Sequence, residues 1–155
     1  HELWKTDGTS ASLVADLNPN YGPGPQSLTV FNNELYFQYN DGTHGYELWK
    51  YDGTNTPSMV IDLNSGWADG TNDTDGLIVF ENTLYFSGNN GTSGVELWAY
   101  NGNNAPYLVG DLDSRTFYGS YPSQFTIFNN QLHFVASYGT TLLKLTPGLT
   151  VVSYS

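Results

Sequence analysis

ELWKYDGT, at residues 47–54, begins with Glu-Leu-Trp, a tripeptide that occurs three times in the chain. This repetition determines the fold. Its copies begin at positions 2, 47 and 96, each inside a longer recurring block. A period of about 40 to 50 residues with four short strand-like segments is typical of a β-propeller blade. We therefore expect an all-β fold, a partial β-propeller built from four-stranded antiparallel blades.

The second block shows the four segments most clearly. Two β-rich segments, 27–31 and 34–39, flank Asn32-Asn33, a pair that tolerates the positive φ angles of a two-residue hairpin. A loop of turn-forming residues follows, and strands are expected at 46–51 and 58–63. The same order recurs in the third block.

About three and a half blades result, because the first block supplies only the last two strands and the last block is degenerate. In that last block Leu142-Leu143-Lys144 stands where Glu-Leu-Trp is expected. An incomplete ring leaves strand edges open. We expect further residues of the same chain to complete it, or, as the alternative, another subunit. The blocks span 1–17 (a half blade), 26–63, 76–112 and 124–155.

Alternation along the third strand separates the repeated residues into two faces. Glu47 and Trp49 point to one face and Leu48 to the other. Both faces of a blade pack against neighbours, so a wide side chain at this position is expected to fill the space between blades. The tryptophans predicted to be in the core are Trp4, Trp49 and Trp98.

Acidic residues also recur once per block. One shares the face of the Trp, and another ends the fourth strand. An acid repeated in every unit is expected to accept backbone or indole N–H bonds. The alternative is a catalytic pair, which needs two carboxyl groups with separated pKa values. The residues are Glu2, Glu47, Glu96, Asp16, Asp62 and Asp111.

The repeated block resembles that of the bacterial ELWxxDGT-repeat proteins. The residues that carry the resemblance are Glu2 to Thr9 (ELWKTDGT) and Glu47 to Thr54 (ELWKYDGT), while the third copy departs after Trp98. The resemblance covers nearly the whole chain. It implies propeller-like repeats in large secreted or surface proteins, and it carries over no catalytic residue.

The loops that leave the fourth strands are the most variable segments, at 18–26, 64–76 and 113–123. Binding residues concentrate on such loops when a rigid scaffold holds them. Each loop carries aromatic residues among Asn, Asp, Ser and Gly. These rings are expected to fill gaps between blades or, as the alternative, to stack on sugars at repeated glycan sites. They are Tyr21, Trp67, Phe117, Tyr118 and Tyr121.

A calcium site is a further hypothesis for the second of these loops. Residues 69–76 are the densest acidic stretch, and Ca²⁺ binds several carboxylate and carbonyl oxygens. The candidate ligands are Asp69, Asp73 and Asp75. A solvated turn is the alternative, since the spacing departs from the EF-hand loop. No other cofactor is expected.

Composition limits the partners and the location. The formal net charge is −11, and such a field repels nucleic acid and anionic lipid surfaces. No segment approaches the roughly 18 apolar residues of a membrane helix, so no membrane insertion is expected. Cysteine is absent, which excludes disulfides and thiolate metal sites. Low charge, many Asn and Thr, and no Cys fit an extracellular or cell-surface protein.

Three functions remain open at this point. A non-catalytic adhesion, assembly or scaffold module leads, because the array is regular and no single unrepeated catalytic constellation stands out. A lectin-like propeller that binds glycan through the loop aromatics is second. An enzyme acting on surface polysaccharide is third. Exposed loop rings would favour the lectin, and buried rings would argue against it.

Overall fold

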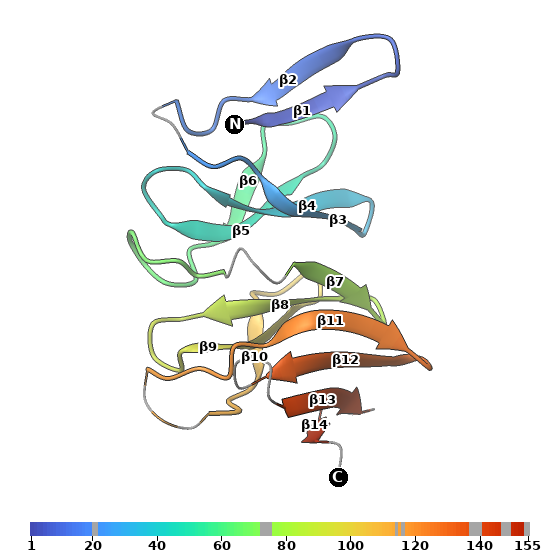
Figure 1. Ribbon diagram of the computed structural model, residues 1–155. Helices are drawn as coiled ribbons and strands as arrows, with labels where there is room; N and C mark the ends of the chain where they lie inside the picture. Colours follow the sequence, from blue (N-terminus) through green and yellow to red (C-terminus); the bar gives the residue numbers. More distant parts are fainter. Residues whose placement is uncertain are drawn as a thin grey trace.

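The computed structural model describes residues 1–19, 22–71, 76–113, 115, 117–136, 141–146 and 150–153. In this part of the chain the regular structure is all strand, with no helix able to cross a membrane. The strands form four antiparallel sheets that follow one another along the chain. Figure 1 shows them stacked from the blue N-terminus to the red C-terminus. The all-β prediction is confirmed.

Each sheet is a meander in which consecutive strands pair. The first sheet has two described strands, β1 (Leu3–Thr6) and β2 (Ala11–Ala15). The second consists of β3 (Gln26–Phe31), β4 (Glu34–Asn40), β5 (Tyr46–Tyr51) and β6 (Ser58–Ile61). The third consists of β7 (Leu77–Phe80), β8 (Thr83–Asn89), β9 (Val95–Tyr100) and β10 (Tyr107–Gly110). The fourth consists of β11 (Ser123–Phe128), β12 (Gln131–Ala136), β13 (Thr141–Thr146) and β14 (Thr150–Ser153).

The first hairpin of each four-stranded sheet has the predicted two-residue turn. Both turn residues have positive φ, at 49° and 63° for Asn32 and Asn33. The values are 47° and 57° for Glu81 and Asn82. Such angles match the right-handed twist of the flanking strands. Asn occupies the second turn position in all three hairpins and the first in two of them, where Glu81 is the exception.

The hydrophobic core lies between sheets. Trp49 and Tyr51 pack with Leu3 of the first sheet. Trp98 packs with Leu48 of the second sheet. A third cluster joins the third and fourth sheets, with Leu97 and Phe134 among its members. The second and third sheets thus bury one face against the sheet before them and the other against the sheet after them.

The prediction that all three tryptophans are core residues is wrong for Trp4. Trp49 and Trp98 are 8% and 6% exposed, but Trp4 is 60% exposed. The Trp face of β5 and β9 is covered by the preceding sheet. No described element covers the corresponding face of β1.

In the fourth sheet the residues equivalent to Glu-Leu-Trp begin one position earlier than expected, at Thr141 instead of Leu142. Phe37 pairs with Trp49 and Phe86 with Trp98, while the equivalent Phe134 pairs with Leu143. Leu143 therefore takes the place of Trp and is likewise buried. The three equivalent residues are Thr141-Leu142-Leu143, so Thr141 replaces the repeated Glu.

Candidate functional site

The loops that leave the fourth strands return over the start of the third strands. Gly70 and Thr71 both donate their backbone N–H to the carbonyl oxygen of Tyr46, each at 2.9 Å. In the third sheet Tyr121 N–H donates to the carbonyl oxygen of Val95, at 3.1 Å. The β4–β5 and β8–β9 loops therefore share one face of the molecule with the loops that follow β6 and β10.

Two glycines mark the closest approach between these loops. A Cβ on Gly45 would come within 2.6 Å of the Ala68 carbonyl oxygen, and a Cβ on Gly94 would clash with the Tyr118 carbonyl. Ala68 and Tyr118 thus occupy equivalent positions. The residues before them, Trp67 and Phe117, are equivalent as well, although they lie five and six residues after the fourth-strand Asp.

Most of the loop aromatics are exposed, and the expectation that they fill gaps is wrong for three of them. Trp67 is 79% exposed, Phe117 72% and Tyr118 59%. Arg115 lies over the ring of Tyr118, 4.7 Å from its centroid. Tyr121 is half-buried. Tyr21 lies outside the described residues.

A half-open pocket of about 350 Å³ lies between the second and third sheets. Ala68 and Asp69 in its lining directly follow Trp67 in the sequence. Asn64, Asp69 and Thr71 line it from the loop after β6. Asn89 and Tyr121 line it from the third sheet and the loop after β10. A carboxylate, two amides, a hydroxyl and an aromatic ring thus surround one cavity.

Hydrogen bonds already fix part of this lining. Asp69 Oδ1 accepts the Tyr46 N–H at 2.8 Å, and Asn64 Nδ2 donates to the Asp69 carbonyl oxygen at 3.2 Å. Thr71 is different, because it is 3% exposed and its Oγ1 has no hydrogen-bond partner. A buried hydroxyl without a partner costs free energy unless something bonds to it. Thr71 contributes to the pocket wall, but its hydroxyl oxygen is itself buried.

The Glu of every Glu-Leu-Trp copy accepts a backbone N–H just beyond the fourth strand, as predicted. The Leu17, Leu63 and Leu112 N–H groups donate to Oε2 of Glu2, Glu47 and Glu96 at 3.2, 3.0 and 3.2 Å. The expected bonds to indole N–H groups are absent in two copies, since Trp49 and Trp98 Nε1 have no acceptor. The repeated Glu therefore holds each blade to its outgoing loop.

A nearby hydroxyl completes this bonding in two of the copies. Ser120 donates to Glu96 through its N–H at 2.9 Å and its hydroxyl at 2.5 Å. Tyr39 donates its hydroxyl to Glu2 Oε2 at 3.2 Å. Glu47 has glycine at both equivalent positions, Gly70 and Gly88.

Gly70 lies at the loop position that Ser120 occupies in the next sheet. Gly88 is the equivalent of Tyr39, because Gly88 pairs with Glu96 as Tyr39 pairs with Glu47. Glu47 Oε1 is buried and has no partner. Burial raises the pKa of Glu47 to about 8, so this group is mostly a neutral carboxylic acid at pH 7. Burial also raises the pKa of Glu96. Because Glu47 is 0% exposed, it cannot touch a ligand in the pocket.

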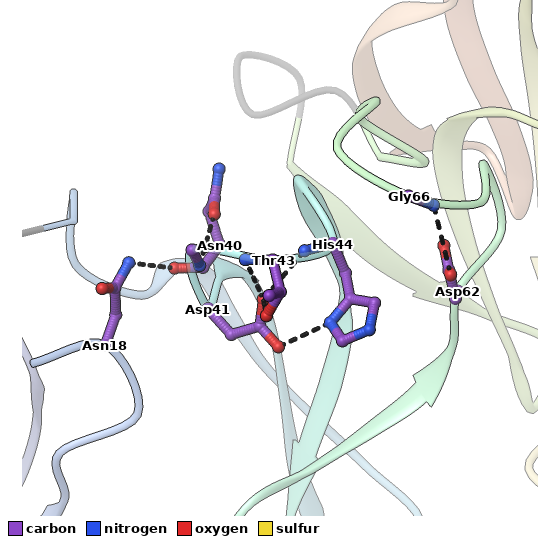
Figure 2. A network of polar contacts seen from close by, with 8 residues as sticks. Asn18, Asn40, Asp41, Thr43, His44, Asp62 and Gly66 are labelled. Atoms are coloured by element: carbon purple, nitrogen blue, oxygen red, sulfur yellow. Dashed lines mark hydrogen bonds and ion pairs between the residues drawn. The ribbon is translucent and has the colours of Figure 1, made fainter. Parts of the chain in front are cut away.

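The loops between the second and third strands are fixed by Asx turns. Asp41 Oδ1 accepts the N–H groups of Thr43 and His44 at 2.8 and 3.0 Å. Asp41 Oδ2 lies 2.7 Å from His44 Nδ1 (Figure 2). Partial burial opposes ionisation, but these bonds lower the pKa of Asp41. The hydrogen bond to Asp41 raises the pKa of His44.

Asn18 joins the first loop to the second sheet. Its Nδ2 donates to the Asn40 carbonyl oxygen at 3.1 Å (Figure 2). In the third sheet Asn90 forms the same turn as Asp41, with Oδ1 accepting the Thr92 and Ser93 N–H groups at 3.0 Å each. The turn is therefore structural and does not need a charge.

The calcium hypothesis gains no support from the described residues. Asp73 and Asp75 lie outside them, and Asp69 Oδ1 is occupied by the Tyr46 N–H. The described part of the chain has no group of three or more His, Cys, Asp or Glu side chains that could hold a metal ion. Calcium binding stays a prediction.

The acids at the ends of the fourth strands are not brought together into one site. Asp16 and Asp111 are exposed, and Asp62 is half-buried. Asp62 Oδ2 accepts the Gly66 N–H at 3.4 Å (Figure 2). Sequence reasoning missed Asn64, Thr71 and Asn89 as pocket residues. Only their position in or beside the variable loops could have indicated them.

Comparisons with known proteins bear on the fold. No protein-family model matches the chain, and no curated protein matches it in sequence. Among solved structures it is similar to a catalytically inactive virginiamycin B lyase from Staphylococcus aureus with quinupristin, at 17% identity and a TM-score of 0.56.

The match covers 88% of this chain and 43% of that chain, so this chain spans less than half the length of the lyase. At this identity the likeness shows the fold alone. Together with the four successive antiparallel sheets, it identifies a partial β-propeller.

Proposed function

We propose that this chain is a non-catalytic, carbohydrate-binding β-propeller module that acts outside the cell or on its surface. One observation carries the proposal: the equivalent loop residues Trp67 and Phe117 are 79% and 72% exposed on the face that holds the pocket. With so much of their surface exposed, these rings contribute little to the packing of the described sheets. Exposed rings of this size at repeated positions suit stacking on the C–H faces of sugars.

The pocket between the loops supplies the second part of a glycan site. Sugars present many hydroxyl groups, and each one needs a donor or an acceptor when it leaves water. The side chains of Asn64 and Asn89 in the pocket wall can meet such groups. Few, well-placed polar groups beside aromatic rings are typical of small-molecule sites.

The role of the repeated acids supports a non-catalytic module. Glu47 and Glu96 are fully buried and hold backbone N–H groups. Neither side chain reaches the pocket surface. A general acid or base must lie within hydrogen-bond reach of its substrate.

The negative charge of the chain limits which class of glycan can bind. The chain carries fifteen acidic and four basic side chains, and Asp69 is in the pocket wall. Polyuronates and sulfated glycans would be repelled. A neutral polysaccharide is therefore the proposed ligand.

Affinity electrophoresis tests this function. The chain would be run through native gels that contain neutral polymers (glucans, xylan, mannan, galactan) or anionic ones (polygalacturonate, alginate). We expect at least one neutral polymer to slow the wild-type chain and the anionic polymers to leave it unchanged. Equal mobility in every gel would contradict the proposal.

A further inference from the structure

Three loops of neighbouring sheets meet around the pocket. Asn64, in the loop after β6, lies against the β8–β9 loop, where a Cβ on Gly91 would come within 2.7 Å of Asn64 Oδ1. Phe117, in the loop after β10, donates its backbone N–H to the Thr92 carbonyl oxygen at 3.2 Å. The loop that carries Trp67 and the loop that carries Phe117 are therefore both joined to the β8–β9 loop.

The pocket lies between the two loops that carry these exposed rings. On the side of the second sheet its wall includes Ala68, the residue after Trp67. On the other side its wall includes Tyr121, four residues after Phe117. Figure 1 shows both loops on the left of the stack. A molecule that leaves the pocket on either side therefore meets a loop with an exposed aromatic ring.

The later of the two loops holds its aromatic residues in an uncommon backbone conformation. Phe117 and Tyr121 have φ angles of 66° and 50°. Bulky residues rarely adopt this left-handed region, and residues held in it cluster at ligand-binding sites. The backbone of this loop thus supports a binding role for the side of the pocket that belongs to the fourth sheet.

The arrangement also indicates which part of a glycan is bound, an inference that rests on the proposed function. We propose that the site binds an internal segment of a neutral polysaccharide, with one sugar unit on Trp67, at least one in the pocket and one on Phe117. Packed sheets lie about 10 Å apart, so one sugar ring cannot contact both aromatic rings. The pocket, at about 350 Å³, is near the lower limit for small-molecule sites and holds only a short part of a glycan chain.

The half-open shape of the pocket favours the middle of a glycan chain over its end. Recognition of an end requires a cavity that closes around the terminal sugar, whereas here Trp67 and Phe117 are 79% and 72% exposed on opposite sides of the pocket. Two linked contacts also increase affinity, because a sugar unit bound at one ring holds the following units at a high effective concentration near the other. Affinity should therefore depend on the length of the glycan.

Isothermal titration calorimetry with oligosaccharides of one to six sugar units tests the length of the site. The probes are the gluco-, xylo-, manno- or galacto-oligosaccharides obtained from the neutral polymer that slows the chain in native gels. We expect the dissociation constant to fall at least about tenfold between two and four units and then to level off. One hexasaccharide should bind per chain. Reduction of its terminal sugar to an alditol should leave its affinity unchanged.

Single variants show whether both rings act on one glycan. In Trp67→Ala and in Phe117→Ala most of the gain in affinity from disaccharide to hexasaccharide should be lost. Val30→Ala, a change at a 70% exposed residue on β3, should keep the wild-type gain.

Three results would overturn this inference and leave the proposed function in place. They are equal affinity for all lengths, two hexasaccharides bound per chain, and loss of binding when the terminal sugar is reduced. A chain that binds none of the neutral polymers would overturn the proposed function itself, and this inference with it.

Discussion

The carboxyl group of Glu47 lies directly against the Cα of Gly70. A Cβ on Gly70 would come within 2.6 Å of Glu47 Cδ and closer still to both oxygens. At the equivalent position of the next sheet Ser120 bonds to Glu96 instead of crowding it. The loop that carries Trp67 is thus held to the blade by an acid that tolerates no side chain at Gly70.

Gly70→Ala is therefore expected to destabilise the chain. The new methyl group must displace either the buried Glu47 side chain or the loop backbone, and overpacking of this kind costs about 1 to 3 kcal/mol. Urea unfolding measures the change. Gly110→Ala is the control, because its Cβ would meet only Leu112 Cδ2, at 3.8 Å. Equal stability of the two variants would mean that Glu47 does not occupy this position.

Burial of Glu47 makes stability depend on pH. Its pKa is raised from 4.5 to about 8, so the folded state binds a proton that the unfolded state releases between these values. The free energy of unfolding should fall as pH rises from about 4.5 to about 8, by on the order of a few kcal/mol. Below the lower value both states are protonated, and the contribution is fully present.

Glu47→Gln should remove most of this slope, because an amide does not ionise. The measurement is urea unfolding of the wild type and the variant from pH 5 to pH 9. Glu34→Gln changes an ion pair with Lys50 near the surface and should keep the wild-type slope. If the slope persists in Glu47→Gln, another group is responsible for it.

Two substitutions of Asp41 distinguish the contribution of the turn's hydrogen bonds from that of the side-chain charge. Asp41→Ala loses the acceptor of the Thr43 and His44 N–H groups and should cost about 1 to 2 kcal/mol. Asp41→Asn keeps that acceptor, as Asn90 does in the third sheet, and loses only a solvent-screened ion pair with His44, so it should cost much less than Asp41→Ala. Thermal unfolding compares the two variants. Equal losses would show that the ion pair, not the turn, holds the loop.

The repeated strands and hairpins could be predicted because they depend on local chemistry. Alternation placed Glu47 and Trp49 on one face, and the tandem Asn residues indicated turns with positive φ. The exposure of Trp4 could not be predicted, because it depends on whether another sheet covers the face. The alternating side-chain pattern is the same in every Glu-Leu-Trp strand, whether or not another sheet covers its Trp face.

The candidate site was only partly visible in the sequence. The variable loops and their aromatics were identified, but the gap-filling interpretation of Trp67, Phe117 and Tyr118 was wrong. The equivalence of Trp67 and Phe117 was hidden by one extra residue in the later loop. Thr71 carries no pattern of its own, and its role depends on a backbone path that places it beside Gly88.

The central claim is that Trp67 and Phe117 bind a neutral glycan, and the affinity of single variants for the polymer that slows the wild-type chain tests it most directly. Trp67→Ala and Phe117→Ala should each raise the dissociation constant about tenfold, or about 1.4 kcal/mol. Val30→Ala, a 70% exposed apolar residue on β3, should leave it unchanged. Unchanged affinity in both loop variants, or an equal loss in Val30→Ala, would contradict the account.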